Sequence, residues 1–420
     1  MFIIGITLFS FTDCTSKPKI NTLHWGKAYT ENGKVIITIF KTLPLWKGEY
    51  DYFNEFKIYR ILCSDFTFGV DHEEYFRNVH FKKKDCIFKG KIDPILSVKF
   101  KFEDKTAKKD SVYAYWIVSS GGVPYGPLPV KIRDTEVWWP YSKITGKLKQ
   151  LQNKYPDYVT FEKIGYSVNR RPINALKIGK GKSSIALIGA IHPGESGPEL
   201  IISALEKLLE QHQDLLKNIS IITVPSSNCD VREKLVSGNP WYLRKNMNGV
   251  DLNRNFPANW IKDEITYNYH TSDPDGFTYR GPFAGSEPET QAVMNFLLEN
   301  NPLAVFSCHC LASICGEMLF TCKAAKNDSN YIKLCYKYAN PFWDGIDPDM
   351  EPQRVKFACT NGSLPAWCYQ KLKIPAFDVE APLNKEDRKK VTHDKTDIVL
   401  LKKYQERFFN GILNILKSFE

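Results

Sequence analysis

Residues 185–195 read IALIGAIHPGE, so a nearly continuous apolar run is followed directly by polar residues. An apolar run of this length is typical of a strand that is covered on both of its faces. Such strands occur where helices pack on both sides of a mainly parallel sheet. The segment therefore predicts an α/β fold in which His192 and Glu195 follow the carboxyl end of a central strand.

Segments of the same character continue along the rest of the chain. Apolar residues at helical spacing predict helices over 142–155 and 199–216. Further apolar runs predict strands over 219–224, 303–307 and 374–377. The alternation of buried strands with helices predicts a mixed, mainly parallel sheet with helices on both faces, formed by residues 138–420. Ser286 and Glu289 fit a capping box at the start of another helix.

The first third of the chain has a different pattern. Residues 20–134 contain short runs rich in β-branched and aromatic residues, such as 35–40 and 111–118, with Gly and Pro between them. Short strands separated by turn residues predict an all-β sandwich domain in front of the α/β domain. Its last hairpin, from Tyr113 to Arg133, resembles that of a fibronectin type III module.

Residues 1–19 form an apolar segment that is too short to span a bilayer. The segment lacks the basic start of a signal peptide, but Cys14 follows its apolar stretch as in a bacterial lipoprotein. We expect an export segment with Cys14 as a lipid-anchor site, which places the protein in the cell envelope or outside the cell. A cytoplasmic location is the alternative. No later stretch is apolar enough for a transmembrane helix.

The composition excludes several classes of protein. Of the 420 residues, 43% are hydrophobic and 25% are charged, which excludes a globally disordered chain. The net charge of +10 is spread along the chain rather than concentrated as in nucleic-acid-binding proteins, so we expect no nucleic-acid partner. The 11 cysteines, most of them between Cys308 and Cys368, allow disulfides without indicating a small disulfide scaffold.

His192 and Glu195 can converge on one metal ion. Catalytic zinc commonly takes two histidines and one glutamate, and His309, at the end of a later apolar strand, is a candidate for the third ligand. Cys308 and Cys310 flank His309. Alternate residues of a strand point to opposite faces, so both thiols should point away when His309 faces the metal. Considered alone, His309 would be interpreted as a hydrogen-bonded core histidine.

Two further polar groups stand later in the chain. The adjacent Asn253 and Arg254 can grip a carboxylate, because arginine offers a planar fork of donors, and Asp251 can orient a metal-bound histidine. A polar loop of structural hydrogen bonds is the alternative interpretation. Glu380 ends the last apolar strand, where a carboxylate can take a proton from an attacking water and deliver it to a leaving amine. Because catalytic groups of open α/β sheets gather at strand ends, these features together indicate an active site.

These motifs resemble those of the zinc carboxypeptidase family, and the likeness covers residues 141–420. It rests on three segments, which are 164–173 (IGYSVNRRPI), 192–195 (HPGE) and 251–255 (DLNRN). Within that family, the likeness is greatest to the bacterial murein peptide amidase A branch. The segments that carry it are 248–260, 285–290 and 360–368, followed by the strand of Glu380.

The resemblance implies a zinc ion held by His192, Glu195 and His309. In such sites zinc lowers the pKa of a bound water to about 7 and polarises the scissile carbonyl. The resemblance further implies that Glu380 acts as general base and general acid. It also implies that Arg244 stabilises the negatively charged oxygen of the tetrahedral intermediate.

The same resemblance implies that Asn253 and Arg254 hold the terminal carboxylate of the substrate. Phe357 stands where digestive members carry a mobile tyrosine, and Ala366 replaces an aspartate of those enzymes, so both departures favour the murein branch. That branch hydrolyses the γ-D-glutamyl–diaminopimelate bond of peptidoglycan peptides, and we expect such a peptide as substrate. The alternatives are a carboxypeptidase acting on ordinary peptide or protein C-termini and an envelope binding protein with an inactive peptidase domain.

Overall fold

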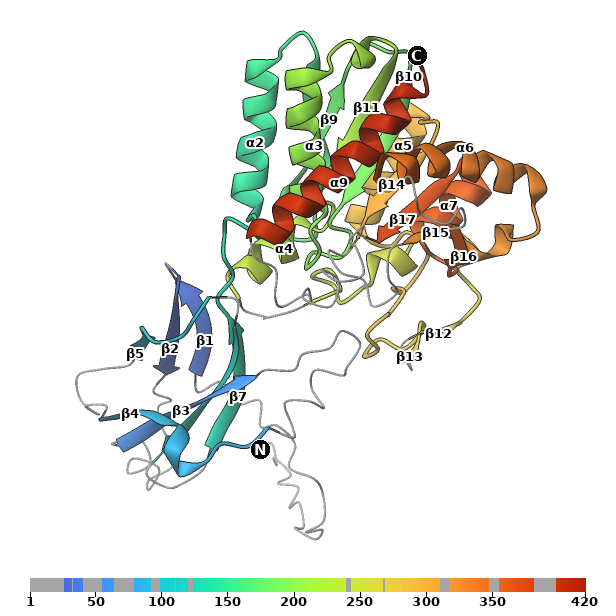
Figure 1. The fold of residues 1–420 in the computed structure, drawn as a ribbon. Helices are drawn as coiled ribbons and strands as arrows, with labels where there is room; N and C mark the ends of the chain where they lie inside the picture. Colours follow the sequence, from blue (N-terminus) through green and yellow to red (C-terminus); the bar gives the residue numbers. More distant parts are fainter. Residues whose placement is uncertain are drawn as a thin grey trace, which may run out of the picture.

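The computed structural model contains an all-β part and an α/β part (Figure 1). It describes residues 26–31, 33–40, 55–63, 79–91, 99–109, 111–119, 124–238, 243–266, 269–309, 318–346, 355–380 and 398–420. The expected export segment with Cys14, and Cys310, lie outside the described residues, so the expectations for them stay predictions. The predicted division of the chain into 1–19, 20–134 and 138–420 also stays a prediction.

The all-β part consists of two antiparallel sheets that share one apolar core. Their orders are β1-β2-β5 and β4-β3-β6-β7. The strands are β1 (Gly26–Glu31), β2 (Lys34–Phe40), β3 (Glu55–Cys63), β4 (Cys86–Lys91), β5 (Lys99–Asp104), β6 (Val112–Ser119) and β7 (Pro124–Lys131). Side chains such as Val35 and Ile37 from one sheet meet Ile58 and Tyr115 from the other. This arrangement confirms the predicted all-β sandwich, while its likeness to a fibronectin type III module stays a prediction.

The α/β part is built on an eight-stranded sheet with the order β16-β15-β17-β14-β10-β11-β9-β8. Its strands are β8 (Val159–Tyr166), β9 (Pro172–Ile178), β10 (Ser183–Gly189), β11 (Ile219–Val224), β14 (Val305–Cys308), β15 (Met318–Cys322), β16 (Val355–Cys359) and β17 (Ala376–Glu380). Four pairings are parallel and three are antiparallel. The mixed, mainly parallel sheet is therefore confirmed.

Helices cover this sheet, and their apolar faces explain where they pack. They are α2 (Tyr141–Lys154), α3 (Gly197–Gln211), α4 (Cys229–Val236), α5 (Pro288–Asn300), α6 (Ser329–Ile346), α7 (Leu364–Trp367) and α9 (Ile398–Lys417). The helix predicted over 199–216 ends at Gln211, after which a single turn, η3 (Leu215–Lys217), leads into β11. In Figure 1, α3 and α9 lie in front of the sheet, and they pack against each other.

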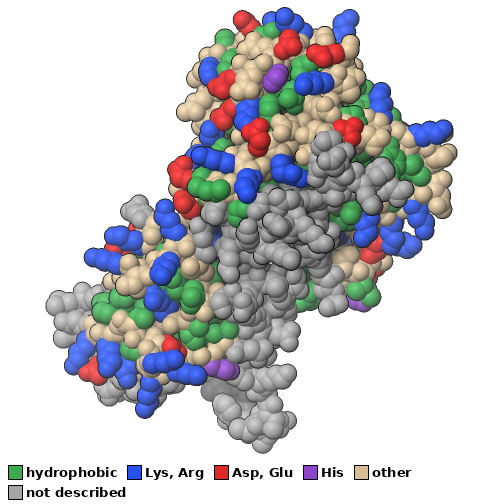
Figure 2. Space-filling view, in the orientation of Figure 1, with side chains coloured by type: hydrophobic (Ala, Val, Ile, Leu, Met, Phe, Trp, Pro, Cys, Tyr) green, Lys and Arg blue, Asp and Glu red, His purple; other side chains and the backbone are tan. Residues whose placement is uncertain are grey.

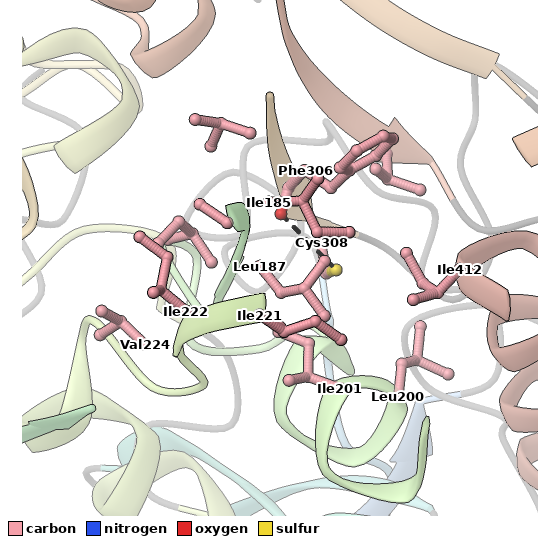
Figure 3. Packing of buried hydrophobic residues seen from close by; sticks show 14 of the residues in the cluster. Ile185, Leu187, Leu200, Ile201, Ile221, Ile222, Val224, Phe306, Cys308 and Ile412 are labelled. Atoms are coloured by element: carbon pink, nitrogen blue, oxygen red, sulfur yellow. Dashed lines mark hydrogen bonds between the residues drawn. The ribbon is translucent and has the colours of Figure 1, made fainter. Parts of the chain in front are cut away.

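The core of the α/β part forms around β10. Residues Ile185 to Ile188 are all fully buried, which means that both faces of this strand are covered. Figure 3 shows Leu187 of β10, Ile221 of β11, Ile201 of α3 and Ile412 of α9 in one apolar cluster. Close packing of this kind fixes the strands rigidly and thereby fixes the residues that follow their carboxyl ends.

Charged residues are distributed over both parts of the molecule. On the face drawn in Figure 2, Lys and Arg side chains are interspersed with Asp, Glu and apolar side chains rather than gathered in one place. Within the described residues, no helix is both long enough and apolar enough to cross a membrane. Cys308, Cys322, Cys335, Cys359 and Cys368 are free thiols, so no disulfide joins these members of the cysteine-rich region.

The start of α5 differs from the predicted capping box. The helix begins at Pro288, and the preceding residue Glu287 makes no side-chain cap. Ser286 instead donates its hydroxyl to Glu287 at 2.6 Å, and Glu289 accepts a hydrogen bond from the Val168 N–H at 3.1 Å. The capping prediction was wrong because both predicted capping side chains have partners that are distant in the chain: Ser286 accepts a hydrogen bond from Asn255 at 2.9 Å, and Glu289 accepts one from Val168.

Candidate metal centre and active site

Three neighbouring parallel strands bring the predicted site residues together. In the sheet β14 lies between β10 and β17, and all three run in the same direction. His192 follows β10, His309 follows β14 and Glu380 is the last residue of β17. Ala190, the residue directly after β10, has a positive φ of 47°. That left-handed turn directs the segment of His192 and Glu195 toward the same edge of the sheet.

His192, Glu195 and His309 form one buried group whose donor atoms face one another. Nδ1 of His192 lies 3.0 Å from Oε1 of Glu195, and Nδ1 of His309 lies 3.0 Å from Oε2 of the same carboxylate. The two Nδ1 atoms are 3.1 Å apart. All three side chains are buried, and one ligand atom from each lies within 4.8 Å of the others. Two imidazoles and one carboxylate are the donor set of many catalytic zinc sites, so these residues fit zinc.

The electrostatics of this group favour a cation. Burial alone would raise the pKa of Glu195, but the His192 and His309 rings outweigh burial and hold that pKa well below its usual range. Burial alone would lower the pKa of His309, yet the carboxylates of Asp378 and Glu195 hold it well above its usual range. Glu195 is therefore ionised, as a metal ligand must be, and the surrounding carboxylates stabilise positive charge at this point.

Asp251 contacts the far side of the His192 ring, as predicted for an orienting residue. Its Oδ1 lies 3.0 Å from Nε2 of His192, and its Oδ2 accepts a hydrogen bond from Nε of Arg244 at 2.8 Å. Burial would raise the pKa of Asp251, but Arg244 and His192 hold it well below its usual range. An ionised Asp251 accepts the Nε2 proton of His192, which leaves the Nδ1 lone pair directed at Glu195 and His309.

Asp378 makes the corresponding contact to His309, a role that we did not predict from the sequence. Its Oδ1 lies 3.1 Å from Nε2 of His309, and the Ser307 hydroxyl lies 3.1 Å from the same nitrogen. The alternation of side chains along β17 could have revealed it, because Asp378 and Glu380 share one face of that strand. Glu380 lies one repeat, roughly 7 Å, farther along the strand toward the sheet edge.

The adjacent Asn253 and Arg254 differ in how far the protein already uses them. Asn253 donates from Nδ2 to Oδ2 of Asp378 at 2.9 Å and accepts at Oδ1 from the N–H of Leu364 at 2.9 Å. Arg254 is buried, and its Nη1 donates to the carbonyl of Asn253 at 2.7 Å. Among the described residues, its Nε has no hydrogen-bond partner and no carboxylate forms an ion pair with Arg254. Arg254 is thus a buried cation available to an incoming anion.

The cysteines beside His309 fit the predicted alternation as far as the structure describes them. Cys308 is buried away from the metal group, with its Sγ 4.0 Å from the carbonyl of Phe306 (Figure 3). Burial raises its pKa, so this residue is a neutral thiol rather than a thiolate ligand.

A buried group of two histidines and one glutamate at the carboxyl ends of sheet strands has the donor set of a catalytic zinc site. The chain belongs to the zinc carboxypeptidase family, whose sequence profile matches residues 144–399, more than half of its length. The predicted family, enzyme class and zinc cofactor are thereby confirmed.

Several known proteins are similar to parts of the chain. Carboxypeptidase N catalytic chain of Mus musculus is 31% identical over 192 residues, which cover 38% of this chain and 41% of that protein. Murein peptide amidase A of Escherichia coli K12 is 46% identical over 70 residues, which cover 16% of this chain and 29% of that protein. The chain therefore spans less than half the length of these relatives.

Solved structures support the fold. The structure of bovine thrombin-activatable fibrinolysis inhibitor matches with a TM-score of 0.55 at 19% identity, over 67% of this chain and 97% of that chain. Carboxypeptidase A from Helicoverpa armigera also matches with a TM-score of 0.55, at 20% identity, over 67% and 73% of the two chains. At this level of identity the matches establish the α/β architecture alone.

Proposed function

We propose that this zinc peptidase hydrolyses the γ-D-glutamyl–diaminopimelate bond of peptidoglycan peptides, next to a free carboxylate of the substrate. The observation that carries the carboxylate requirement is Arg254, a buried guanidinium with no described carboxylate partner, close in sequence to Asp251 of the metal centre. A buried cation of this kind gains most from a bidentate carboxylate. The stretch of 46% identity to murein peptide amidase A supports the peptidoglycan substrate.

The residues of the chain have separate tasks in this reaction. Arg254 binds the substrate carboxylate and thereby places the scissile amide beside His192, Glu195 and His309, which hold zinc. When bound, zinc acts as a Lewis acid on the scissile carbonyl and makes an attacking water more acidic. Glu380 removes a proton from that water and delivers it to the departing amine.

Arg244 stabilises the oxyanion in this proposal. Its Nε is engaged by Asp251 at 2.8 Å, which fixes the plane of the guanidinium and orients its terminal amino groups. A preorganised donor of this kind stabilises the charge that develops on the carbonyl oxygen. Asp251 therefore orients two groups, the ring of His192 and the guanidinium of Arg244.

Hydrolysis of ordinary peptide C-termini is the second candidate, and the 31% identity to carboxypeptidase N catalytic chain favours it. Mass spectrometry of the purified, zinc-loaded protein with L-alanyl-γ-D-glutamyl-diaminopimelate and with plain peptides separates the two. Release of diaminopimelate supports the peptidoglycan substrate, whereas release of C-terminal residues from plain peptides alone supports the second candidate. If zinc is bound and neither product forms, the protein is an inactive binding protein.

We propose that the protein lies in the cell envelope or outside the cell, where peptidoglycan lies; this proposal rests on the expectation that residues 1–19 are an export segment with Cys14 as a lipid-anchor site. A cytoplasmic enzyme acting on recycled cell-wall peptides is the alternative. Fractionation of producing cells, with the mass of the mature N-terminus, distinguishes them. A full-length protein in the cytosolic fraction would contradict the envelope location.

A further inference from the structure

The sandwich is attached to the α/β part at the segment that leads to Arg244. The N–H of Thr30 in β1 donates to the carbonyl of Ser237 at 3.1 Å, and the N–H of Lys131 in β7 donates to the carbonyl of Gly238 at 3.3 Å. Nε of Arg133 donates to the carbonyl of Leu235 at 3.0 Å. Both sheets of the sandwich therefore hold the chain as it leaves α4, a few residues before Arg244.

This attachment is a close contact of backbones. Gly238 has a φ of 77°, and a Cβ atom at this position would lie 1.8 Å from the carbonyl oxygen of Lys131. Only glycine allows both this conformation and this approach. The two parts are thus fitted to each other at Gly238 rather than merely joined by a linker.

A second contact reaches Arg244 itself. The outer face of the four-stranded sheet carries an apolar cluster that includes Tyr59 and Trp116, and Phe277 of the α/β part packs against it. The guanidinium carbon of Arg244 lies 5.6 Å from the centre of the Phe277 ring. Lys245 donates to the carbonyl of Gly276 at 3.0 Å. The loop of Phe277 therefore lies between the four-stranded sheet of the sandwich and the segment of Arg244.

The opposite flank of that segment is held within the α/β part. Asn246 donates from Nδ2 to Glu287 at 2.6 Å, and its backbone N–H donates to the carbonyl of Val250 at 2.8 Å. Arg244 consequently lies between an anchor that belongs to the α/β part and anchors that the sandwich supplies.

We propose that the sandwich contributes to the active site by supporting two features of the α/β part, Phe277 and Gly238. These two features hold Arg244 in its catalytic position. The inference rests on the proposed role of Arg244 at the oxyanion. Phe277 is a positioning residue, because its ring face attracts the guanidinium while its other contacts tie it to the sandwich. Loss of the ring removes one of the contacts that position Arg244, while Asp251 keeps its contacts with Arg244 and His192.

The test compares full-length Phe277→Ala with Phe277→Tyr, which keeps the ring. For Phe277→Ala we expect kcat to fall about tenfold, with KM and zinc affinity in a chelator competition nearly unchanged. Phe277→Tyr should restore kcat. Phe88→Ala is the matched control, because Phe88 packs into the core on the opposite face of the same sheet. It removes similar packing without a contact to Arg244 and should leave kcat unchanged.

Hydrogen exchange of the backbone amides in 243–251 tests the inference independently of catalysis. Phe277→Ala should speed exchange in this segment, and Phe88→Ala should not. Unchanged kcat and unchanged exchange in Phe277→Ala would overturn the inference, as would an equal loss of kcat in Phe88→Ala. If the wild type hydrolyses no peptide but exchange in 243–251 still responds to Phe277→Ala, the proposed function fails and the structural coupling stands.

Discussion

The sandwich and the α/β part each contain a buried aspartate held by an arginine, yet the two aspartates serve different ends. In the sandwich, Oδ2 of Asp104 accepts from Nη1 of Arg60 at 2.7 Å and from the Tyr115 hydroxyl at 2.9 Å, and Oδ1 accepts from Thr106. In the α/β part, Asp251 accepts from Arg244 and from His192. Both aspartates accept a hydrogen bond from an arginine, but the charged groups around the two pairs differ.

The difference lies in the charge that remains after the partners are paired. One carboxylate and one guanidinium balance each other around Asp104, and its contacts are all within the sandwich. Around His192 and His309 lie three carboxylates, those of Glu195, Asp251 and Asp378, and two arginines act on Asp251, Arg244 through an ion pair and Arg254 through space. A paired cluster stabilises a fold, whereas surplus buried negative charge around imidazoles needs a cation.

The largest effect should come from Glu380→Gln, which affects only the α/β part. An amide cannot accept the proton of the attacking water, so we expect kcat to fall about 10³-fold. Elemental analysis should find zinc unchanged. Substantial turnover in the zinc-loaded variant would remove Glu380 from its proposed role.

His309→Ala should weaken zinc binding by more than about 100-fold, since loss of a ligand's outer partner alone costs 10–100-fold. Competition with a chromogenic chelator measures the change. Cys308→Ala is the control from the neighbouring position, and its zinc affinity should equal that of the wild type. The reverse result would make the cysteine, rather than His309, the third ligand.

Asp378→Asn should lower zinc affinity about 10–100-fold, because the amide cannot serve His309 and Asn253 as the carboxylate does. The same chelator competition applies. Cys359→Ala removes a thiol that lies 3.5 Å from Oδ2 of Asp378, and it should leave zinc affinity unchanged. Equal affinity in Asp378→Asn and the wild type would show that His309 is oriented by other contacts, such as that of Ser307.

The counterpart in the sandwich is Asp104→Asn, which should lower the free energy of unfolding by about 2 kcal/mol and leave zinc affinity unchanged. Urea denaturation followed by tryptophan fluorescence measures stability. A change in zinc affinity, with little loss of stability, would contradict the division between a structural and a functional aspartate.

The smallest effect is the pH dependence of that stabilisation. Burial would raise the pKa of Asp104, but hydrogen bonds from Thr106, Arg60 and Tyr115 outweigh it and lower the pKa. A folded-state pKa below the unfolded one means that the stabilisation is present above the ordinary pKa and is lost as the pH falls below it. The difference in unfolding free energy between wild type and Asp104→Asn should therefore shrink as the pH falls from 7 toward 3. A constant difference would exclude ionised Asp104 as its source.

The sequence was sufficient to predict those site residues that directly follow an apolar strand. His192 and Glu195 stand three residues apart after an apolar strand, and the structure joins them to His309 in one group. The expected contact of Asp251 with a histidine is also present. These predictions succeed because strand ends in an α/β sheet gather at one edge, whatever the intervening loops do.

The sequence was insufficient where one side chain has several competing partners. Asn253 was expected to face the substrate, but its amide also contacts Asp378 and Leu364, which lie more than a hundred residues away. Asp378 was overlooked for the same reason, since its partner His309 belongs to a different strand. Glu289 was assigned to a helix cap, although it binds Asn246 and Val168.

By itself, the sequence determined the α/β class, the metal-binding residue types and the family, because each depends on short motifs and on the period of apolar residues. Only the tertiary structure decided which carboxylate orients which histidine, which arginine has no carboxylate partner among the described residues and which loop the sandwich supports. These choices depend on strand order and on contacts between the two parts, and both are set by packing between residues that are distant in the chain.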